Sequence, residues 1–289
     1  MSIIGHNKER GILQRIVMSG TPAQSYIFSG PDKVGKFLVA EEFAEALASG
    51  SSLDIRVVEP EREEKDGVTK EKMIPVESIR ELRIFLSSYP SRGRFRIGIV
   101  RDAHRLTESS QNALLKMLED PVDSAILILT THESGRILGT VRSRCQVISF
   151  EPVAEDVITI GMQELFPSGT AVEPFFFSLG RPGLPISAAR DVKGFEKKKV
   201  LLRQLFRLGS LPVSDRLALS EQLGKNVPLG IELCEWYLLG AREQLRKGGE
   251  AITVREKLLF LDRMSATLAT LKATQANGRL AFDILFLSA

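Results

Sequence analysis

Four consecutive segments decide the fold of this chain: IGIVRDAHRL (97–106), TESSQNALLKMLEDP (107–121), AILILTTHES (125–134) and VRSRCQVISF (141–150). The first, third and fourth contain short apolar runs that are typical of buried strands. The second begins with a capping residue, Thr107, and ends at Pro121, which is the pattern of a helix. The order strand, helix, strand, strand predicts part of a parallel α/β sheet.

The same alternation extends toward the N-terminus. Apolar runs that predict strands alternate with amphipathic helical patterns, in the order 25–30, 37–49, 53–60, 76–88 and 94–100. We therefore expect one α/β domain over residues 1–151. The charged segment EPEREEKDGVTKEK (59–72) inside this domain is expected to be a solvated loop or an excursion from the domain.

Strand signals fade after residue 151. AEDVITIGMQELF (154–166) predicts a helix that leads to the Gly- and Pro-rich stretch SLGRPGLP (178–185), so we expect a small helical domain over 152–192. Further helical patterns, separated by Gly, Pro or polar breaks, predict an all-helical domain over 193–289. Trp236 is expected in the core of that domain or at a subunit interface.

The charge of the chain is nearly balanced. It has 39 Lys and Arg against 36 Asp and Glu, and this net charge of +3 is too small to indicate nucleic-acid binding by itself. The two cysteines, Cys145 and Cys234, make no disulfide framework and no CxxC zinc pair. The charged start and the lack of about 18 consecutive apolar residues predict a cytoplasmic protein without a membrane partner.

A phosphate-binding loop is predicted within YIFSGPDKVGKF (26–37). Gly30, Gly35 and Lys36 fit the Gly-x4-Gly-Lys spacing between a strand and a helix, where backbone amides and the lysine hold phosphate oxygens. The next position of an active loop carries a hydroxyl that binds magnesium, but here it is Phe37. The alternative is a tight turn in which the glycines serve only the geometry. Whether ATP or ADP occupies the loop stays open.

The acidic pair of a hydrolytic site is also altered. Such a site follows its buried strand with an Asp that binds magnesium and a Glu that orients the attacking water. Arg101 and Asp102 stand at these places, and an arginine would repel the metal. If Asp102 is the metal ligand instead, Ala103 stands where the base belongs, so either alignment predicts weak or absent hydrolysis. His104 has no second ligand near it in the sequence, and no metal site is expected.

Several segments resemble the delta-prime subunits of bacterial DNA polymerase III clamp loaders, which are AAA+ proteins. These segments are IIGHNKERGILQRIV (3–17), FSGPDKVGK (28–36), AHRLTESSQNALLKMLEDP (103–121), ILILTT (126–131) and VRSRCQVISF (141–150). The combination of the QNALLK-type helix with the SRC triplet is specific to the wider clamp-loader family. The resemblance implies an AAA+ α/β sheet domain, a small helical lid over 152–192 and an all-helical collar over 193–289 that assembles a five-membered ring.

The resemblance also assigns site residues. Ser143, Arg144 and Cys145 match the family's SRC motif, which implies that Arg144 is an arginine finger. It would reach the γ-phosphate of ATP on a neighbouring subunit, and a permanently charged planar guanidinium suits that contact. Without this context, Arg144 would be interpreted as part of a surface ion pair. Thr130 or Thr131 matches the place of a phosphate-sensing polar residue.

The lid departs from the pattern of active relatives. These resemble GSxRDAL at this point, with an arginine that contacts ATP. GRPGLPI (180–186) puts Gly183 at that arginine and leaves Arg181 out of register. The family's frequent cysteine cluster for zinc has no counterpart in SGSSLDIRVVEPE (49–61), so no zinc is expected.

These observations predict a non-hydrolysing stator subunit of a DNA polymerase III clamp loader that requires no cofactor of its own. The expected partners are motor ATPase and delta-like subunits in a heteropentamer, with the sliding clamp and primed DNA contacted through the complex. Two alternatives stay open: a weakly active AAA+ ATPase that uses Lys36 and Asp102, and an autonomous DNA-binding protein on the same fold. Gln111 and Lys116 are expected on a solvated face or facing DNA.

Overall fold

The chain is described by a computed structural model over residues 3–65, 68–166, 178–246, 251–274 and 276–288. It divides into two compact units, the first comprising Met1–Gly169 and Gly180–Leu184, and the second Thr170–Leu179 and Pro185–Ala289. The predicted small domain at 152–192 is therefore divided between the two units. The boundaries of a three-domain organisation stay a prediction.

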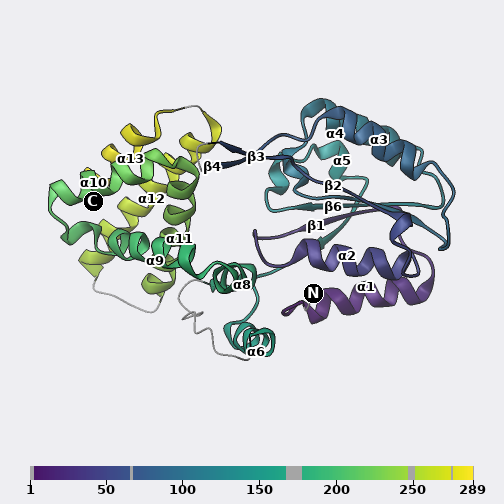
Figure 1. The fold of residues 1–289 in the computed structure, drawn as a ribbon, viewed down its shortest axis with the longest axis horizontal. Coiled ribbons are helices and arrows are strands. Elements are labelled where there is room, and N and C mark those ends of the chain that lie inside the picture. The colour runs from purple at the N-terminus through teal and green to yellow at the C-terminus, as the bar shows by residue number, and fades with distance from the viewer. Residues whose placement is uncertain (1–2, 66–67, 167–177, 247–250, 275, 289) are drawn as a thin grey trace. The chain divides into compact units, whose positions relative to one another are not determined.

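A parallel sheet forms the centre of the first unit (Figure 1). Its strands lie in the order β2 (Ile55–Val58), β5 (Arg96–Val100), β6 (Ala125–Thr131), β1 (Ser25–Ser29) and β7 (Gln146–Ser149). All neighbouring strands pair in parallel, so the predicted parallel sheet is confirmed. Because the strands share one direction, their carboxyl ends and the loops that follow them meet at one edge of the sheet.

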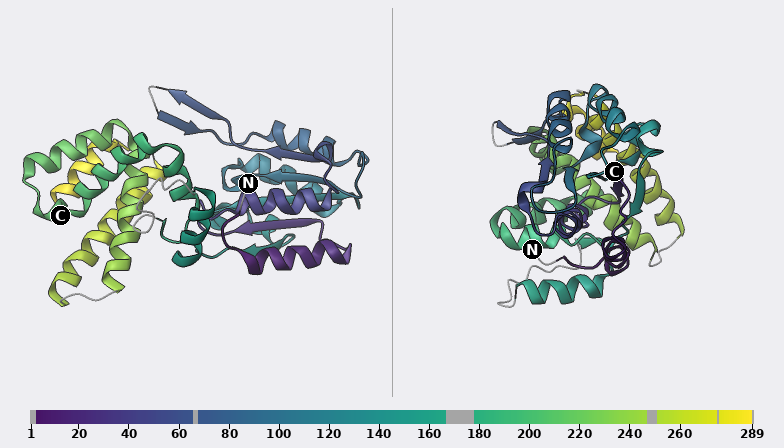
Figure 2. Two further views of the ribbon diagram at one scale, coloured as in Figure 1. Left: turned by 60° about the horizontal axis from the view of Figure 1, so that its bottom comes forward. Right: turned by 90° about the vertical axis from the view of Figure 1, so that its right-hand side faces the viewer.

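Helices cover both faces of the sheet, as Figures 1 and 2 show. One layer consists of α1 (Asn7–Ser19) and α2 (Lys36–Leu47), and the other of α3 (Val76–Leu86) and α4 (Glu108–Glu119). Successive residues of a strand point to opposite faces, so Tyr26 and Phe28 pack in the core with α1 and α2, whereas Ile27 packs in the core with α3 and α4. A strand covered on both faces buries the side chains of both faces, and AILILTT of β6 is buried at every residue.

The charged segment 59–72 is not an irregular loop. It contains an antiparallel pair of strands, β3 (Arg62–Lys65) and β4 (Val68–Glu71), which form a sheet separate from the main one, so the segment is the excursion that was the second alternative. The register places residues of opposite charge in opposed positions, such as Glu63 and Lys70. Composition alone does not show this register.

The remaining elements of the first unit are short, apart from one lid helix. They are η1 (Ser52–Asp54), η2 (Ala103–Arg105), η3 (Ser134–Arg136), α5 (Gly139–Arg142) and α6 (Glu155–Leu165). The predicted helix at 154–166 is confirmed by α6. The predicted cap of α4 is also confirmed, since Thr107 Oγ1 accepts a hydrogen bond of 3.1 Å from the backbone N–H of Ser110.

The second unit is helical, as predicted. Its elements are α8 (Gly183–Arg190), which begins within the first unit's segment, α9 (Val192–Phe206), η4 (Leu208–Ser210), α10 (Val213–Lys225), α11 (Val227–Arg246), α12 (Ala251–Ala273) and α13 (Gly278–Leu287). Trp236 and Cys234 of α11 are buried, which confirms the core position predicted for Trp236. Neither α8 nor α13 was expected as a separate helix.

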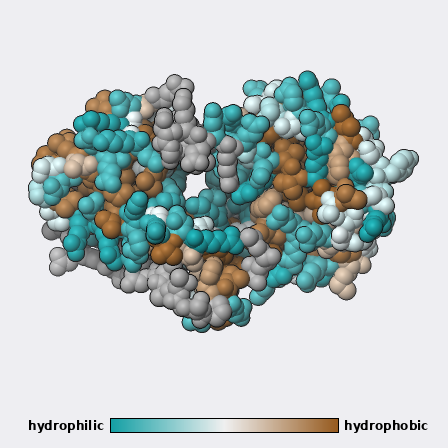
Figure 3. Space-filling view, in the orientation of Figure 1, coloured by the Kyte–Doolittle hydropathy of each residue, from teal (hydrophilic) through white to brown (hydrophobic). Residues whose placement is uncertain are grey.

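The surface is mixed in character. On the face drawn in Figure 3, hydrophobic residues lie among hydrophilic ones in both units, in keeping with the nearly balanced charge of the chain. Among the helices that the structure describes, none has the length and apolar character needed to cross a membrane.

A buried carboxylate, Asp54, anchors the chain between α3 and β5. Its Oδ1 accepts hydrogen bonds from Ser91 N at 2.7 Å and Ser91 Oγ at 2.8 Å, and its Oδ2 accepts one from Arg92 N at 3.1 Å. Burial opposes the charged form of Asp54, but these hydrogen bonds outweigh it and hold the pKa of the carboxyl well below its usual value. The carboxylate therefore stabilises this segment only while it is ionised.

Replacing Asp54 with Ala is expected to lower the free energy of unfolding at pH 7 by about 3 kcal/mol, because buried donors lose a charged acceptor. Asp54→Asn keeps one acceptor oxygen and should lose less. Since the folded-state pKa is depressed, the contribution of Asp54 is complete above the unfolded pKa of about 3.9 and fades as the pH falls below it. Urea unfolding followed by circular dichroism at pH 7 and pH 3 measures this. A difference between wild type and Asp54→Ala that does not shrink at pH 3 would contradict the assignment.

Candidate functional site

The predicted phosphate-binding loop joins β1 to α2 at the carboxyl edge of the sheet. Gly35 has a φ of 110°, which suits glycine and strains other residues. Lys36 Nζ donates hydrogen bonds to the carbonyl oxygens of Gly30, at 2.9 Å, and Pro31, at 2.6 Å. Burial lowers the pKa of Lys36 to about 8, against the opposing effect of the charges on Asp32 and Asp102. The lysine thus folds over its own loop.

An aromatic ring and a cation stand beside this loop. The guanidinium carbon of Arg101 lies 4.8 Å from the centroid of the Phe37 ring, which is a cation–π distance. Arg101 also donates a hydrogen bond of 3.1 Å to Glu59 Oε2. The side chain therefore extends from the end of β5 across Phe37 to Glu59. Neither Phe37 nor Arg101 offers an atom that binds magnesium.

Asp102 follows Arg101 in a left-handed backbone conformation with a φ of 51°. Its Oδ2 lies 3.7 Å from Arg101 Nε, and its Oδ1 lies 3.8 Å from His132 Nδ1. Burial favours the neutral acid, but interaction with His132 and the charges of His104 and Arg101 outweigh burial and lower the pKa of Asp102. Asp102 is therefore ionised at neutral pH, between an arginine and two histidines.

The two threonines at the end of β6 are buried and bonded within the protein. Thr130 Oγ1 accepts a hydrogen bond of 3.3 Å from the backbone N–H of Asp102. Thr131 Oγ1 accepts one of 3.1 Å from the backbone N–H of Glu133 and lies 3.4 Å from His104 Nδ1. Both hydroxyls hold the carboxyl edge together, and the phosphate-sensing role of Thr131 stays a prediction.

Two histidines lie in contact at the same edge. The rings of His104 and His132 have centroids 4.0 Å apart and an interplanar angle of 63°. Burial lowers the pKa of His104 to about 4, and the charge of His132 adds to this effect. His104 is therefore neutral at pH 7.

Sequence reasoning missed this pair because His104 and His132 are far apart along the chain. The available signal was that each follows the end of a buried strand, β5 for His104 and β6 for His132. These strands are neighbours in the sheet, so their following loops meet.

The lid segment of the first unit closes onto the phosphate-binding loop through its backbone. The N–H of Gly183 donates a hydrogen bond of 2.9 Å to the carbonyl oxygen of Lys33. A Cβ atom at Gly183 would come within 2.8 Å of that oxygen. Gly183, which aligns with the lid arginine of active relatives, therefore packs its backbone directly on the backbone of Lys33. A larger side chain at this position would require the two segments to move apart.

The SRC triplet lies between α5 and β7. Arg144 NH1 donates a hydrogen bond of 3.0 Å to the carbonyl oxygen of Thr140, and Arg144 NH2 lies 3.0 Å from Glu119 Oε1. Ser143 Oγ also bonds Thr140 O, at 3.1 Å. Burial raises the pKa of the Cys145 thiol, so Cys145 stays protonated at neutral pH. Arg144 is therefore the only residue of the triplet that is both exposed and charged.

Arg144 lies at the end of the sheet opposite to the chain's own phosphate-binding loop. Its carbonyl oxygen accepts a hydrogen bond of 2.7 Å from Ser25 Oγ, and Ser25 is the first residue of β1. The phosphate-binding loop begins at Gly30, after the last residue of that strand. At about 3.3 Å per residue, the intervening strand spans roughly 16 Å, which is longer than an arginine side chain.

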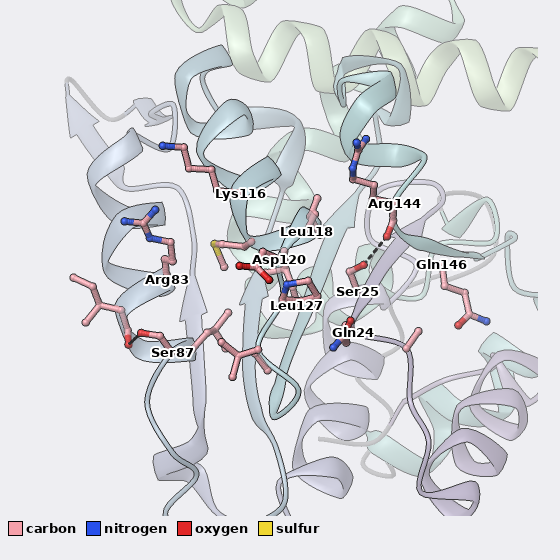
Figure 4. Close-up of a pocket in the computed structure, with 17 residues that line it drawn as sticks. Gln24, Ser25, Arg83, Ser87, Lys116, Leu118, Asp120, Leu127, Arg144 and Gln146 are labelled. Carbon is pink, nitrogen blue, oxygen red and sulfur yellow. Dashed lines mark hydrogen bonds between the residues drawn. The ribbon is translucent and has the colours of Figure 1, made fainter.

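Arg144 borders a pocket of about 460 Å³ at this amino end of the sheet (Figure 4). Two further cations line the pocket, Arg83 from α3 and Lys116 from α4. Figure 4 shows Ser25 bonded to the main chain of Arg144, with the guanidinium turned away from that bond. The pocket is therefore lined by cations from three segments of the chain and by the carboxylate of Asp120.

The sequence suggested that Gln111 lies on a solvated face or faces DNA. Its side chain is buried instead, so the prediction of an exposed position is wrong. Its Nε2 donates a hydrogen bond of 3.0 Å to Arg136 O, and its Oε1 accepts one of 2.7 Å from the backbone N–H of Leu138. Gln111 thereby ties α4 to the segment that leads to α5. Lys116 on the same helix is exposed, as expected.

Comparison with known families and proteins adds an independent finding. A model of the family described as DNA polymerase III, delta subunit, matches residues 5–154. The chain is 30% identical over 143 residues to DNA polymerase III subunit delta' of Pseudomonas aeruginosa, covering 43% of this chain and 42% of that protein. It is 28% identical over 183 residues to subunit tau of Bacillus subtilis, covering 56% of this chain and 31% of that protein. The chain thus spans less than half the length of these relatives.

Solved structures agree with the predicted AAA+ fold. A DNA polymerase III gamma subunit-related protein of Thermotoga maritima has a TM-score of 0.58 and 21% identity, covering 96% of this chain and 97% of that chain. The RuvB Holliday junction branch migration motor of the same organism has a TM-score of 0.51 and 18% identity, covering 76% and 82%. At these identities the likeness concerns the fold alone.

Gly183→Ala is expected to lower the free energy of unfolding by about 2 kcal/mol, because the added methyl group meets the Lys33 carbonyl and forces the lid segment outward. Gly135→Ala is the matched control, since a Cβ atom there meets nothing within 4 Å. Thermal unfolding of both variants gives the comparison. Equal melting temperatures would show that the contact between Gly183 and Lys33 does not hold the lid segment.

Proposed function

Because the chain belongs to the DNA polymerase III delta-subunit family of clamp-loader proteins, we propose that it is a non-hydrolysing subunit that supplies Arg144 in trans to ATP on a neighbouring subunit. The observation that carries this proposal is the location of Arg144, one strand length from its own phosphate-binding loop. A guanidinium in that place can contact only a nucleotide that another chain presents.

The surroundings of Arg144 support its use by a partner. Its ion pair with Glu119 has side chains that are 38% and 55% exposed. Exposed pairs of this kind are worth about 0–1 kcal/mol, whereas charge-assisted contacts to phosphate in a water-excluded site are stronger. A γ-phosphate can therefore displace Glu119 at little cost. Until then Glu119 keeps the guanidinium ordered.

The chain's own site lacks the groups that hydrolysis needs. Phe37 stands in place of the magnesium-binding hydroxyl, Arg101 in place of the acidic metal ligand, and Gly183 in place of the lid arginine. Three changes along one reaction path favour a subunit that does not hydrolyse ATP over an ATPase subunit that has diverged but stays active. Nucleotide hydrolysis by the complex then belongs to the neighbouring subunit.

The second unit supports a role in assembly. Helices α10 and α13 each carry large apolar residues at helical spacing that are 40% to 65% exposed: Val213, Leu217, Leu280, Ile284 and Leu287. Exposed apolar stripes of this kind suit contacts between subunits. The proposed partners are motor ATPase and delta-like subunits of a cytoplasmic heteropentamer, which brings the sliding clamp and primed DNA together.

Arg144→Ala is expected to leave assembly intact and to lower the DNA-dependent ATPase rate of the reconstituted complex by about tenfold or more. Arg142→Ala is the matched control, because Arg142 is an exposed arginine at the end of α5, two residues before Arg144. Gel filtration checks assembly, and a steady-state ATPase assay with primed DNA and clamp gives the rate. An unchanged rate in a fully assembled Arg144→Ala complex would reject the proposed role.

The isolated chain is expected to hydrolyse no ATP above background in the presence of Mg²⁺, because its loop lacks a metal-binding hydroxyl and an acidic pair. A phosphate-release assay on the purified chain measures this. The control is a variant with Lys36→Ala, in which any hydrolysis by the loop should be lost. Magnesium-dependent turnover that Lys36→Ala abolishes would favour a weakly active ATPase instead.

A further inference from the structure

A cluster of potential metal ligands lies at the carboxyl edge of the sheet, and the proposed function does not use it. Asp102 and His104 follow β5, and His132 follows β6. One oxygen of Asp102 and one nitrogen of each histidine all lie within 4.8 Å of one another. The three side chains thus converge from two neighbouring strand ends.

The spacing suits ligands of a single ion better than hydrogen bonds. The 3.8 Å between His132 Nδ1 and Asp102 Oδ1 is too long for a hydrogen bond. Two ligands of a tetrahedral ion with bonds of about 2.0–2.2 Å are roughly 3.4 Å apart. The separations here reach 4.8 Å, so binding one ion requires the imidazoles to turn toward Asp102.

One ligand atom is buried and unsatisfied. Within the described part of the chain, His132 Nδ1 is a buried nitrogen without a hydrogen-bond partner. A buried polar atom of this kind needs an explanation, because leaving it unpaired is unfavourable. A cation between His132 and Asp102 would supply the missing interaction.

Neighbouring groups orient the ligands. His132 Nε2 lies 3.6 Å from the Glu133 carboxylate, which is ion-pair range and beyond a hydrogen bond, and Glu133 is itself paired with Arg136. Nδ1 is thus the nitrogen turned toward Asp102. His104 Nδ1 lies 3.4 Å from Thr131 Oγ1. Carboxylates and hydroxyls in contact with metal-binding imidazoles are common, because they fix the orientation of the ring.

Cations near the cluster are held by other groups. Lys36 Nζ donates to the carbonyl oxygens of Gly30 and Pro31, and Arg101 NH1 donates to Glu59. Arg101 Nε lies 3.7 Å from Asp102 Oδ2, whereas Oδ1 is the oxygen that faces His132. One oxygen of Asp102 therefore stays available to a metal ion.

We propose that Asp102, His104 and His132 bind one late first-row divalent metal ion of the zinc class. Two imidazoles and one carboxylate are the ligand set of such ions, whereas Mg²⁺ prefers oxygen ligands alone. Three protein ligands leave a fourth position open to water. The ion links the ends of β5 and β6, and this proposal replaces the expectation from the sequence that no metal is bound.

The test uses the full chain without a polyhistidine tag, treated with chelator and then titrated with Zn²⁺ against a chromogenic competitor. We expect one ion per chain. His132→Asn and His104→Asn should each weaken the affinity at least tenfold, and Glu133→Gln by about tenfold. His6→Gln is the matched control, because His6 is the chain's other histidine and bonds Val34 O away from the cluster.

Titration with Co²⁺ gives a second readout, since the visible absorption of bound Co²⁺ reports a low-coordinate nitrogen and oxygen site. Zn²⁺ should also raise the melting temperature of wild type and His6→Gln but not of the His104→Asn and His132→Asn variants, whose folding is checked by circular dichroism. Binding that survives both substitutions, or a site that takes Mg²⁺ and not Zn²⁺, would overturn the proposal. The proposed ion site and Arg144 lie at opposite ends of the sheet. A negative result in the metal titration therefore leaves the Arg144 proposal unaffected, and a negative result with Arg144→Ala leaves the metal proposal unaffected.

Discussion

The common direction of the five strands is the constraint on which both functional regions depend. It gathers the phosphate-binding loop, Asp102 and the two histidines at one edge of the sheet, and it puts Arg144 at the other. The hydrogen bond from Ser25 to the Arg144 carbonyl ties the arginine to the start of the strand that ends at the loop. A chain built in this way cannot bring Arg144 to its own nucleotide, whatever the state of its loop. Because the two edges are a strand length apart, a substitution at one edge does not contact residues at the other.

At the carboxyl edge, the side chains beside the loop that joins β1 to α2 make structural contacts with one another. Arg101 packs on Phe37 by a cation–π contact and pairs with Glu59. Such a contact is worth about 0.5–2 kcal/mol, comparable to the other local interactions of this edge. Lys36 bonds to its own loop carbonyls, and Gly183 packs on Lys33. The loop is thus held by interactions within the first unit.

The sequence predicted much of the fold and part of the site, for identifiable reasons. Buried parallel strands such as AILILTT leave an apolar signal, and the Thr107 cap leaves a local one. The hairpin at β3 and β4 was missed because a pairing of charged residues has no such signal. Gln111 was misplaced because its partners, Arg136 O and Leu138 N, lie in a distant loop. The pair of His104 and His132 depends on strand order, which periodicity does not determine.

The two edges of the sheet differ in how closely their residues depend on one another. Arg144 is held by an exposed ion pair with Glu119 and one backbone carbonyl, so its environment places few demands on the rest of the sheet. The carboxyl edge is different, because Asp102 is bordered by Arg101 and His132 and bonded through its backbone to Thr130. A change at any one of these residues leaves a charge or a buried polar atom without its counterpart. Substitutions at the carboxyl edge must therefore occur in compatible sets, whereas Arg144 at the amino edge can change with little effect on its neighbours.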